Sequence, residues 1–398
     1  MLLTYAVIWA YSGLHFLKTG VSFALHNYYG DFLANFPAHA IAACVNPDLF
    51  SGSLAEQWLP PPRWGYGPGM HLVTLPLLFL PTLRDAYLVW LFVNYVFLAV
   101  GCWLLFRLAF QGSMTLPKVT MFGFLVLNYY PLYEALIQRN IEIFEFLLIV
   151  GAMTQFSQRG DAIAGSLVGF AAMTKFLPGI FVPYFVLKGR WRATWAAVVV
   201  IGILGVLAQV TLGWEHNWVF IQLWKGSYLE YSLNQAVSGA VLRLARLAGL
   251  QDYGIALSRA ILLILAMALA WVLVRFRSGG NWKIEWSLLI VAMIMLPPHS
   301  QNYYLTFLLI PYAMLLGMVN DGVLQGWPSK ALIATSFVLT GWPIPLSLLD
   351  RALGRPAGDL LLSLSVSAVG VALLVVVLIR ALWETSVRSL PPKAVATS

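Results

Sequence analysis

The feature that most limits the fold is a series of long apolar runs broken only by short polar or basic segments. Residues 193–213 and 255–275 are two of these runs, and each contains few charged side chains. The hydrocarbon core of a bilayer is about 30 Å thick, and a helix needs about 20 apolar residues to cross it. The sequence therefore predicts an all-α, polytopic transmembrane protein.

The composition leaves little room for any other kind of domain. Apolar residues make up 60% of the 398 and charged residues only 10%, whereas a soluble domain carries about 25% charged residues. We therefore expect residues 1–398 to form a single transmembrane domain. The net charge of +8 does not indicate a nucleic-acid partner, because most Lys and Arg residues lie in short loops, as in other membrane proteins.

Hydropathy predicts about ten to twelve spans. The number is a range because three runs (119–133, 162–173 and 176–187) are short for a full crossing. The first run has no basic region before it and no small-residue cleavage site after it, so we interpret it as a retained anchor. The expected spans are 2–25, 86–107, 119–133, 141–157, 162–173, 176–187, 193–213, 255–275, 284–297, 302–319, 331–349 and 359–381.

The basic residues predict the orientation. With the N-terminus inside, twelve spans place thirteen Lys and Arg residues in the cytoplasm and about five on the other face, in agreement with the positive charge of cytoplasmic loops. Two long loops, 26–85 and 214–254, then face outward, and 382–398 is a cytoplasmic tail. Segment 69–82 and the aromatic second loop suit helices that lie in the membrane interface.

The first outer loop, which we expect to be catalytic, contains a candidate general base. Asp31 lies beside aromatic residues at the membrane surface, where partial desolvation would suit a carboxylate to accept a proton from a hydroxyl. Alternatively, Asp31 caps an interfacial helix that begins at Phe32, and Asp48 and Glu56 are rival carboxylates. Tyr66 lies among glycines and prolines that predict a tight turn in which backbone can approach a ligand.

Lys175 lies between the two short runs 162–173 and 176–187. A lysine at mid-depth of one long helix is costly, so the sequence favours a hairpin with Lys175 at its turn. An ionisable group there indicates an anionic partner, or else a structural pair with Glu142 or Glu145. Arg139 and Glu142 are three residues apart in a helical segment, which predicts a local ion pair between them.

The second outer loop, which we expect to bind substrate, offers Asn234, Gln235 and Arg243. Arg243 and Arg246 share a helix face, which suits contact with lipid phosphates or with a phosphate on a ligand.

The segment 296–304 (LPPHSQNYY) is unusually polar for this chain. A short polar loop between two spans would explain it. However, His299 and Asn302 between buried helices are good hydrogen-bond donors to a phosphate or a sugar. We therefore interpret both as candidate binding residues.

No cofactor site is visible. Cys44 and Cys102 are expected to be unpaired and cannot form a metal site. No G-x-G-x-x-G motif follows a strand, and the carboxylates do not cluster in the pair that nucleotide-sugar enzymes use for a metal.

In their order along the chain, these segments resemble the bacterial polyprenol-phosphate-mannose-dependent α-mannosyltransferases of the GT-C superfamily. The resemblance covers residues from about 28 to 320 and rests on the ordered set rather than on one motif. The set comprises Asp31-Phe32, Tyr66-Gly67-Pro68 with Leu75-Pro76-Leu77 and Leu80-Pro81, Gln138-x-Asn140, Ala164-Gly165 leading to Lys175-x-x-Pro178, the basic loop 188–192, Asn234-Gln235 with Arg243, and Pro298-His299-Ser300 with Tyr303-Tyr304.

The resemblance implies an inverting transferase that uses a sugar on a polyprenyl phosphate as donor. We expect no metal to be needed, because side chains would cover the phosphate. Asp31 would deprotonate the acceptor hydroxyl, and His299 would help to hold the donor phosphate. The chain departs from the family, which usually shows Tyr-Pro-Pro, Gly-Gln-Val-Asn and Asn-Gln-Ser where this chain has Tyr66-Gly67-Pro68, 137–140 (IQRN) and Asn234-Gln235-Ala236. These departures leave the donor sugar (mannose, glucose or arabinofuranose) and the acceptor open.

The expected function is transfer of a sugar, in the first place mannose, to a lipid-linked or envelope-glycan acceptor on the outer face of the cytoplasmic membrane. The membrane lipids and both substrates are then the partners. The alternatives are a transporter or flippase of a lipid-linked saccharide and a non-catalytic assembly factor. A transporter would place ionisable residues near the midplane, often in two repeated halves, whereas here they gather in the outer loops.

Overall fold

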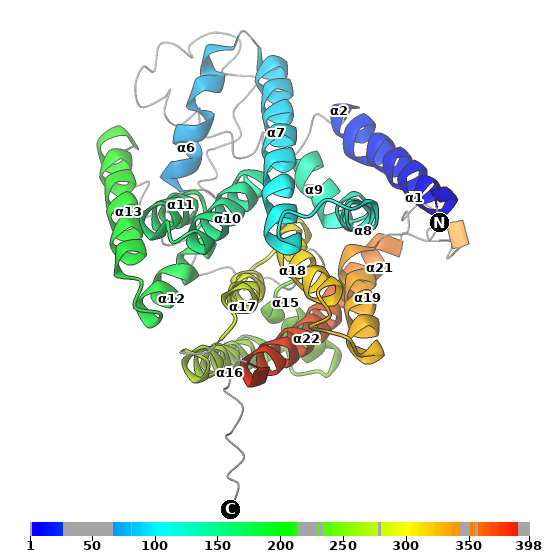
Figure 1. Ribbon diagram of the computed structural model, residues 1–398. Helices are drawn as coiled ribbons and strands as arrows, with labels where there is room; N and C mark the ends of the chain where they lie inside the picture. The colour runs from blue at the N-terminus through cyan, green and yellow to red at the C-terminus, as the bar shows by residue number, and fades with distance from the viewer. Residues whose placement is uncertain are drawn as a thin grey trace, which may run out of the picture.

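The computed structural model describes residues 2–26, 67–80, 82–212, 230–277 except Tyr231 and Leu233, 280–342, and 351–388 except 353, 355 and 356. Over these residues the chain is helical, and one isolated bridge between Asn234 and Gln301 is the β pairing found there. The predicted all-α fold is therefore confirmed. Figure 1 shows the helices packed side by side around α17, α18 and α10.

The α-helices are α1 (Leu2–His15), α2 (Ala24–His26), α6 (Pro68–Thr74), α7 (Leu83–Phe110), α8 (Leu116–Leu127), α9 (Tyr130–Gln138), α10 (Glu142–Ser157), α11 (Asp161–Thr174), α12 (Phe181–Leu187), α13 (Trp191–Leu212), α15 (Val237–Leu247), α16 (Gly254–Arg275), α17 (Trp282–Met295), α18 (Leu309–Asn320), α19 (Trp327–Gly341), α21 (Ala357–Ser363) and α22 (Val366–Arg388). A π-helical segment η1 (Phe16–Phe23) joins α1 to α2, and the 3₁₀ segments are η3 (Leu75–Phe79), η4 (Leu177–Ile180), η5 (Gln251–Tyr253) and η6 (Asn302–Leu308).

Several helices are long and apolar enough to cross a membrane. Among the described residues there are five: Arg84–Phe110, Trp191–Val210, Gln251–Arg275, Asn302–Asn320 and Val366–Ser386. Three shorter apolar helices, Leu116–Leu127, Asp161–Thr174 and Leu177–Leu187, correspond to the three runs that the sequence marked as short. The chain is a membrane protein. Helix α22 continues to Arg388, so the first residues of the predicted tail are helical.

The predicted span 119–133 is not one helix. Helix α8 ends at Leu127, and α9 begins at Tyr130 with Pro131 in its first turn. Proline has no N–H to donate, so it suits the first turn of a new helix rather than the middle of a longer one. The Asn128 side chain at the break donates to the Phe124 carbonyl at 3.0 Å and to the Ser12 hydroxyl at 2.7 Å.

The chain leaves the helix at Lys175, as the sequence predicts. Helix α11 ends at Thr174, and Lys175 has extended backbone angles, with φ −143° and ψ 144°. Pro178 then begins the short 3₁₀ segment η4, which leads into α12. The alternative of one long helix through Lys175 is therefore wrong.

Small residues let α11 and α13 pack closely. A Cβ atom at Gly165 would lie 2.0 Å from the Ala193 carbonyl oxygen, and one at Gly169 would lie 2.6 Å from the Ala197 carbonyl oxygen. Close backbone approach at small residues is the common way in which membrane helices associate. These glycines therefore hold α11 in register, and α11 in turn fixes the position of Lys175.

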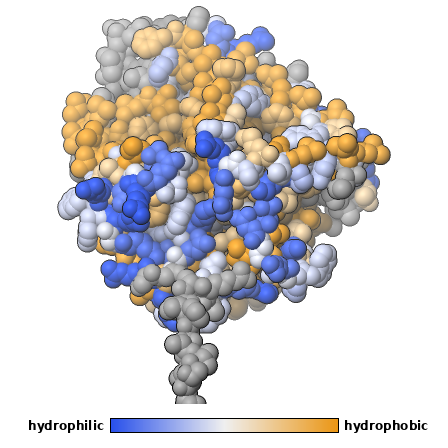
Figure 2. All heavy atoms as spheres, in the orientation of Figure 1, coloured by the Kyte–Doolittle hydropathy of each residue, from blue (hydrophilic) through white to orange (hydrophobic). Residues whose placement is uncertain are grey.

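Two of the segments predicted to be cytoplasmic, 188–192 and 275–283, meet near the start of α17. Lys188 donates to the Phe276 and Arg277 carbonyls at 3.2 and 3.0 Å and pairs with the buried Glu285 at 2.6 Å. Figure 2 shows hydrophilic residues over the central and lower part of one face, with hydrophobic residues along its upper margin.

The glycine contact gives a stability prediction. Gly165→Ala should lower the free energy of unfolding by about 1–3 kcal/mol, because backbone must move to admit the methyl group. Gly202→Ala on the same pair of helices is the matched control, since a Cβ there meets nothing within 4 Å. Thermal unfolding in detergent measures both. A Gly165→Ala protein as stable as the Gly202→Ala protein would contradict the packing.

Candidate functional site

The loop that carries His299 is held against Asn234 and Gln235, which lie just before α15. The Gln235 amide N–H donates to the Ser300 carbonyl at 2.6 Å, and the Ser300 N–H donates to Asn234 Oδ1 at 3.0 Å. Asn234 Nδ2 donates in turn to the Pro298 carbonyl at 3.1 Å. These bonds fix the backbone on both sides of His299.

Arg243 holds Asn234 from the other side. Its Nη2 donates to the Asn234 carbonyl at 2.9 Å and to the Ser365 hydroxyl at 2.7 Å, and its Nη1 donates to the Glu230 carbonyl at 3.3 Å. The guanidinium therefore ties α15 to the junction before α22. The Gln235 side chain reaches the same junction, donating to the Leu362 carbonyl at 3.2 Å.

Arg246 does not join Arg243 in this role. It pairs with Glu230 at 2.9 Å, and its side chain is exposed. The two arginines therefore differ in role: Arg243 makes contacts within the protein, and Arg246 makes a surface ion pair.

Lys175 lies in a buried cluster with Glu142 and two tyrosines. Its Nζ pairs with Glu142, which is fully buried, and donates to the Tyr304 hydroxyl at 3.0 Å. The ammonium also lies 4.1 Å from the ring centre of Tyr304 and 5.5 Å from that of Tyr303, within cation–π range. The contact found is therefore the alternative that the sequence left open, a structural pair with Glu142. The cluster joins the break after α11 to the segment that follows His299.

The residues that follow Tyr66 in the sequence contact the end of α11, next to Lys175. The Gly67 N–H donates to the Thr174 carbonyl at 2.8 Å, and the Thr174 hydroxyl donates to Glu145 at 2.6 Å. A Cβ at Gly69 would lie 3.0 Å from Met173 and Thr174 atoms, so α6 packs directly on the end of α11. Residues 69–79 of the predicted interfacial segment are helical, in α6 and η3, and its position in the membrane interface stays a prediction. Asp31, Tyr66, Asp48, Glu56 and Cys44 lie outside the described residues.

Asn302 contacts a carboxylate that the sequence did not single out. Its Nδ2 donates to Glu134 at 2.6 Å. Glu134 lies on α9, outside the predicted spans. Burial raises the pKa of Glu134 to about 7, and the hydrogen bond from Asn302 opposes this shift. Its position among charged and polar residues at a span end was visible in the sequence, but its distant partner was not.

The predicted ion pair between Arg139 and Glu142 is wrong. Arg139 instead donates to the Ile137 carbonyl at 3.0 Å and to the Ala24 carbonyl, and its guanidinium lies over the Tyr87 ring. Arg139 has φ 52° and ends α9, so it is not on the same helix as Glu142. The helical spacing that predicted the pair is therefore absent.

The structure thus brings together most of the predicted site residues at the end of the bundle that carries η6. His299 and Asn302 share one loop, Asn234, Gln235 and Arg243 hold that loop, and Lys175 contacts its tyrosines. The Asn234 amide donates to a backbone carbonyl, and Arg243 donates to backbone carbonyls and to Ser365. Over the described residues, no group of three His, Cys, Asp or Glu residues lies close enough to hold a metal ion.

Comparison with known proteins gives a family match. The sequence profile of glycosyltransferase family 87 matches residues 64–298. No curated protein matches the chain. Among solved structures, the chain is similar to the apo crystal structure of ArnT from Cupriavidus metallidurans, at 14% identity and a TM-score of 0.45, over 97% of this chain and 78% of that one.

The Glu134 environment predicts a pH dependence of stability. The Glu134 carboxyl has a pKa of about 7 in the folded protein, above its ordinary value of 4.5. At pH values between these two, the carboxyl therefore takes up a proton when the protein folds. This contribution is fully present below the lower pKa and decreases as pH rises through about 7. Thermal unfolding at roughly pH 5 and roughly pH 8 should show a smaller difference for Glu134→Gln than for wild type.

The control for this comparison is Glu384→Gln, which removes a carboxylate paired at the surface with Arg380. It should keep the wild-type pH dependence. An unchanged pH dependence in Glu134→Gln would show that Glu134 does not titrate in this range.

Proposed function

The chain belongs to glycosyltransferase family 87, and we propose that it is an inverting, GT-C-type enzyme that moves a sugar from a polyprenyl phosphate to a lipid-linked or envelope-glycan acceptor. Mannose is the sugar proposed first. The observation that best supports the proposal is the His299 loop, fixed by Asn234 and joined through Tyr304 to Lys175. Because the loop backbone is fixed before substrate binds, it can hold a hydrogen-bond donor for a phosphate oxygen without reorganising during the reaction.

The reaction needs one base. The acceptor hydroxyl oxygen attacks the anomeric carbon, the bond from that carbon to the phosphate oxygen breaks, and the polyprenyl phosphate leaves with the electron pair. We assign Asp31 as the base that accepts the hydroxyl proton, on the basis of its sequence position in the first outer loop and of the family resemblance. The attacking oxygen approaches the anomeric carbon from the face opposite the leaving phosphate, so the configuration at that carbon is inverted.

The leaving phosphate needs hydrogen-bond donors and positive charge. We assign His299 to direct contact with the phosphate or the sugar. Asn302, whose amide donates to Glu134, acts in this proposal beside His299 rather than as a direct ligand. Lys175 adds positive charge beside Tyr304, but its pairing with Glu142 leaves a nearly neutral cluster. Asn234, Gln235 and Arg243 act in this proposal as positioning residues for the loop rather than as ligands, because their bonds go to the protein.

The proposal places the site on the outer face of the cytoplasmic membrane, toward the periplasm or the cell exterior. Support comes from the basic residues Lys188, Arg277 and Lys283 at the opposite end of the bundle, as expected for cytoplasmic loops. A donor that already carries a phosphate leaving group requires no nucleotide-binding fold, and the proposal includes no metal or cofactor.

The test is transfer by the purified enzyme in proteoliposomes. Radiolabelled mannose, glucose and arabinofuranose are each supplied on polyprenyl phosphate together with a crude lipid acceptor. Transfer from one donor to a lipid or glycan product supports the proposal. Movement of an intact labelled donor across the bilayer without transfer would instead support a flippase.

Asp31→Asn keeps the shape of the side chain and removes its proton affinity. We expect turnover to fall by about 10²-fold or more, with donor binding largely kept, as for loss of a positioned base. Steady-state kinetics and donor binding measure the two effects separately. Near-normal turnover would exclude Asp31 as the base and direct attention to Asp48.

His299→Ala should weaken both donor affinity and turnover, because charge grows on the phosphate as the sugar leaves. The expected loss is about 1.5–3 kcal/mol, the range for a hydrogen bond to a charged group. His299→Gln, which can still donate a hydrogen bond but cannot be protonated, separates the bond from the charge. Asn234→Ala frees the loop and should lower turnover in the same direction. Unchanged binding and turnover in His299→Ala would make His299 a packing residue.

A further inference from the structure

A polar cavity lies at the end of α17 opposite His299. Its volume is about 490 Å³, and it lies between the ends of α7 and α18, the start of α17 and the last turns of α22. Lys283 lines it, and Met295 ends α17 on the other side. Twelve residues of helix separate the two, which is about 18 Å at 1.5 Å per residue. The cavity is therefore separate from the proposed transfer site.

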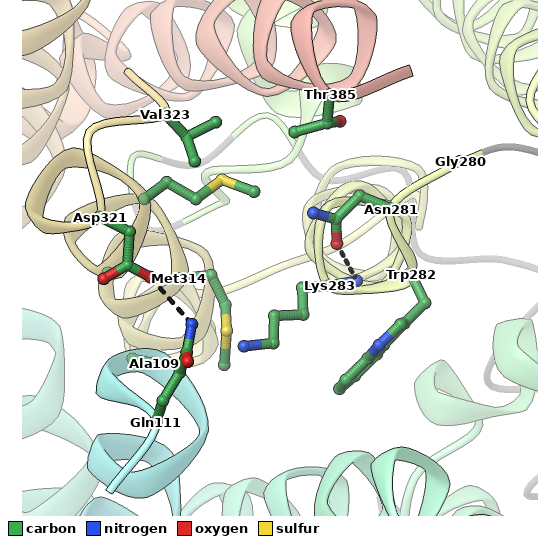
Figure 3. A pocket seen from close by; sticks show the side chains of 12 residues that line it. Ala109, Gln111, Gly280, Asn281, Trp282, Lys283, Met314, Asp321, Val323 and Thr385 are labelled. Carbon is green, nitrogen blue, oxygen red and sulfur yellow. Dashed lines mark hydrogen bonds between the residues drawn. The ribbon is translucent and has the colours of Figure 1, made fainter. Parts of the chain in front are cut away.

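One side of the cavity is rich in donors. The Lys283 ammonium donates one hydrogen bond, to the Leu108 carbonyl at 2.7 Å, and an ammonium has three N–H groups. Figure 3 shows this side chain extending into the cavity between Trp282 and Met314. The Asn281 side chain accepts from the Lys283 backbone N–H at 3.0 Å, and its amide group faces the same space. This side suits an anionic group.

The opposite side carries the one carboxylate of the lining, that of Asp321. Asp321 follows the last residue of α18, where helix carbonyls leave partial negative charge. It accepts from Gln111 at 3.1 Å and from Asn320 at 3.0 Å, and a carboxylate can accept further bonds. Figure 3 shows Asp321 and Gln111 together, away from Asn281 and Trp282. This side suits a cation that has N–H groups to donate.

The two sides together restrict the ligand. The lining has one cation, Lys283, and one anion, Asp321. The two also act on each other electrostatically, so a ligand with one kind of charged group would compensate one and leave the other, whereas a ligand with both an anionic and a cationic group would match both. The rest of the lining includes Met314, Met318 and Val323, which suit an apolar part of the same ligand.

We propose that this cavity binds a phosphoethanolamine-type zwitterion, with its phosphate at Lys283 and Asn281 and its primary ammonium at Asp321. The chemistry has two sources: the headgroup of phosphatidylethanolamine in the adjoining leaflet, or a free phosphoethanolamine. The inference does not depend on the proposed transferase activity.

Calorimetry on the purified full-length protein tests the proposal with four probes. These are dihexanoyl phosphatidylethanolamine, its phosphatidylcholine and phosphatidylglycerol analogues, and O-phosphoethanolamine. We expect the ethanolamine lipid to bind about tenfold or more tightly than the other two lipids, since choline has no N–H and the glycerol headgroup has no cation. Comparable binding of O-phosphoethanolamine would make a free solute the source, and binding of the lipid alone would make it the bilayer. Equal binding of the three lipids overturns the proposal.

Variants locate the site. Lys283→Met and Asp321→Asn should each weaken ethanolamine-lipid binding by about tenfold or more. Lys330→Met and Asp252→Asn change an exposed lysine and an exposed aspartate outside this cavity, and they should leave binding unchanged. Unaltered affinity in both cavity variants overturns the assignment. If either variant fails to fold, the probe comparison on the wild-type protein still decides the ligand class.

Discussion

The buried ion pair between Lys175 and Glu142 is the interaction on which the site end of the bundle depends. It joins α10, the break after α11 and the loop that leads into η6, because Lys175 also donates to Tyr304. Both charges are removed from water, so loss of one partner would leave the other uncompensated, at a cost of about 3–5 kcal/mol. The packing of Gly165 against Ala193 supports the pair by holding α11 in place.

Polar side chains in this protein divide into those that shape the backbone and those that remain for a ligand. Asn234 and Gln235 bind carbonyls and an N–H of neighbouring segments, and Arg243 binds two carbonyls and a serine. In a chain this apolar, loops between spans have few other means to satisfy their backbone groups. A polar residue near the site is therefore as often part of the loop's support as of its chemistry.

The two ends of the bundle differ in character. At one end, Lys175, Glu142 and the His299 loop form a compact buried cluster. At the other, Lys188 and Glu285 close one corner, while Lys283 and Asp321 line an open cavity. Helices α17 and α18 connect these ends, so a substitution in their middle can affect both. The family match covers residues 64–298, and the two ends carry separate hypotheses.

The sequence by itself determined the helical membrane class, the break at Lys175 and the ordered set of polar loops, because span length and the cost of a charge in lipid act locally. It also allowed the pairing of Lys175 with Glu142. It did not determine that Arg139 donates to the distant Ala24 carbonyl instead of pairing with Glu142. Nor did it determine that Asn302 contacts Glu134, or that Asn234 holds the His299 loop. Those contacts join residues from 64 to 168 positions apart, and only the packing of helices in three dimensions decides which of several possible polar partners each side chain meets.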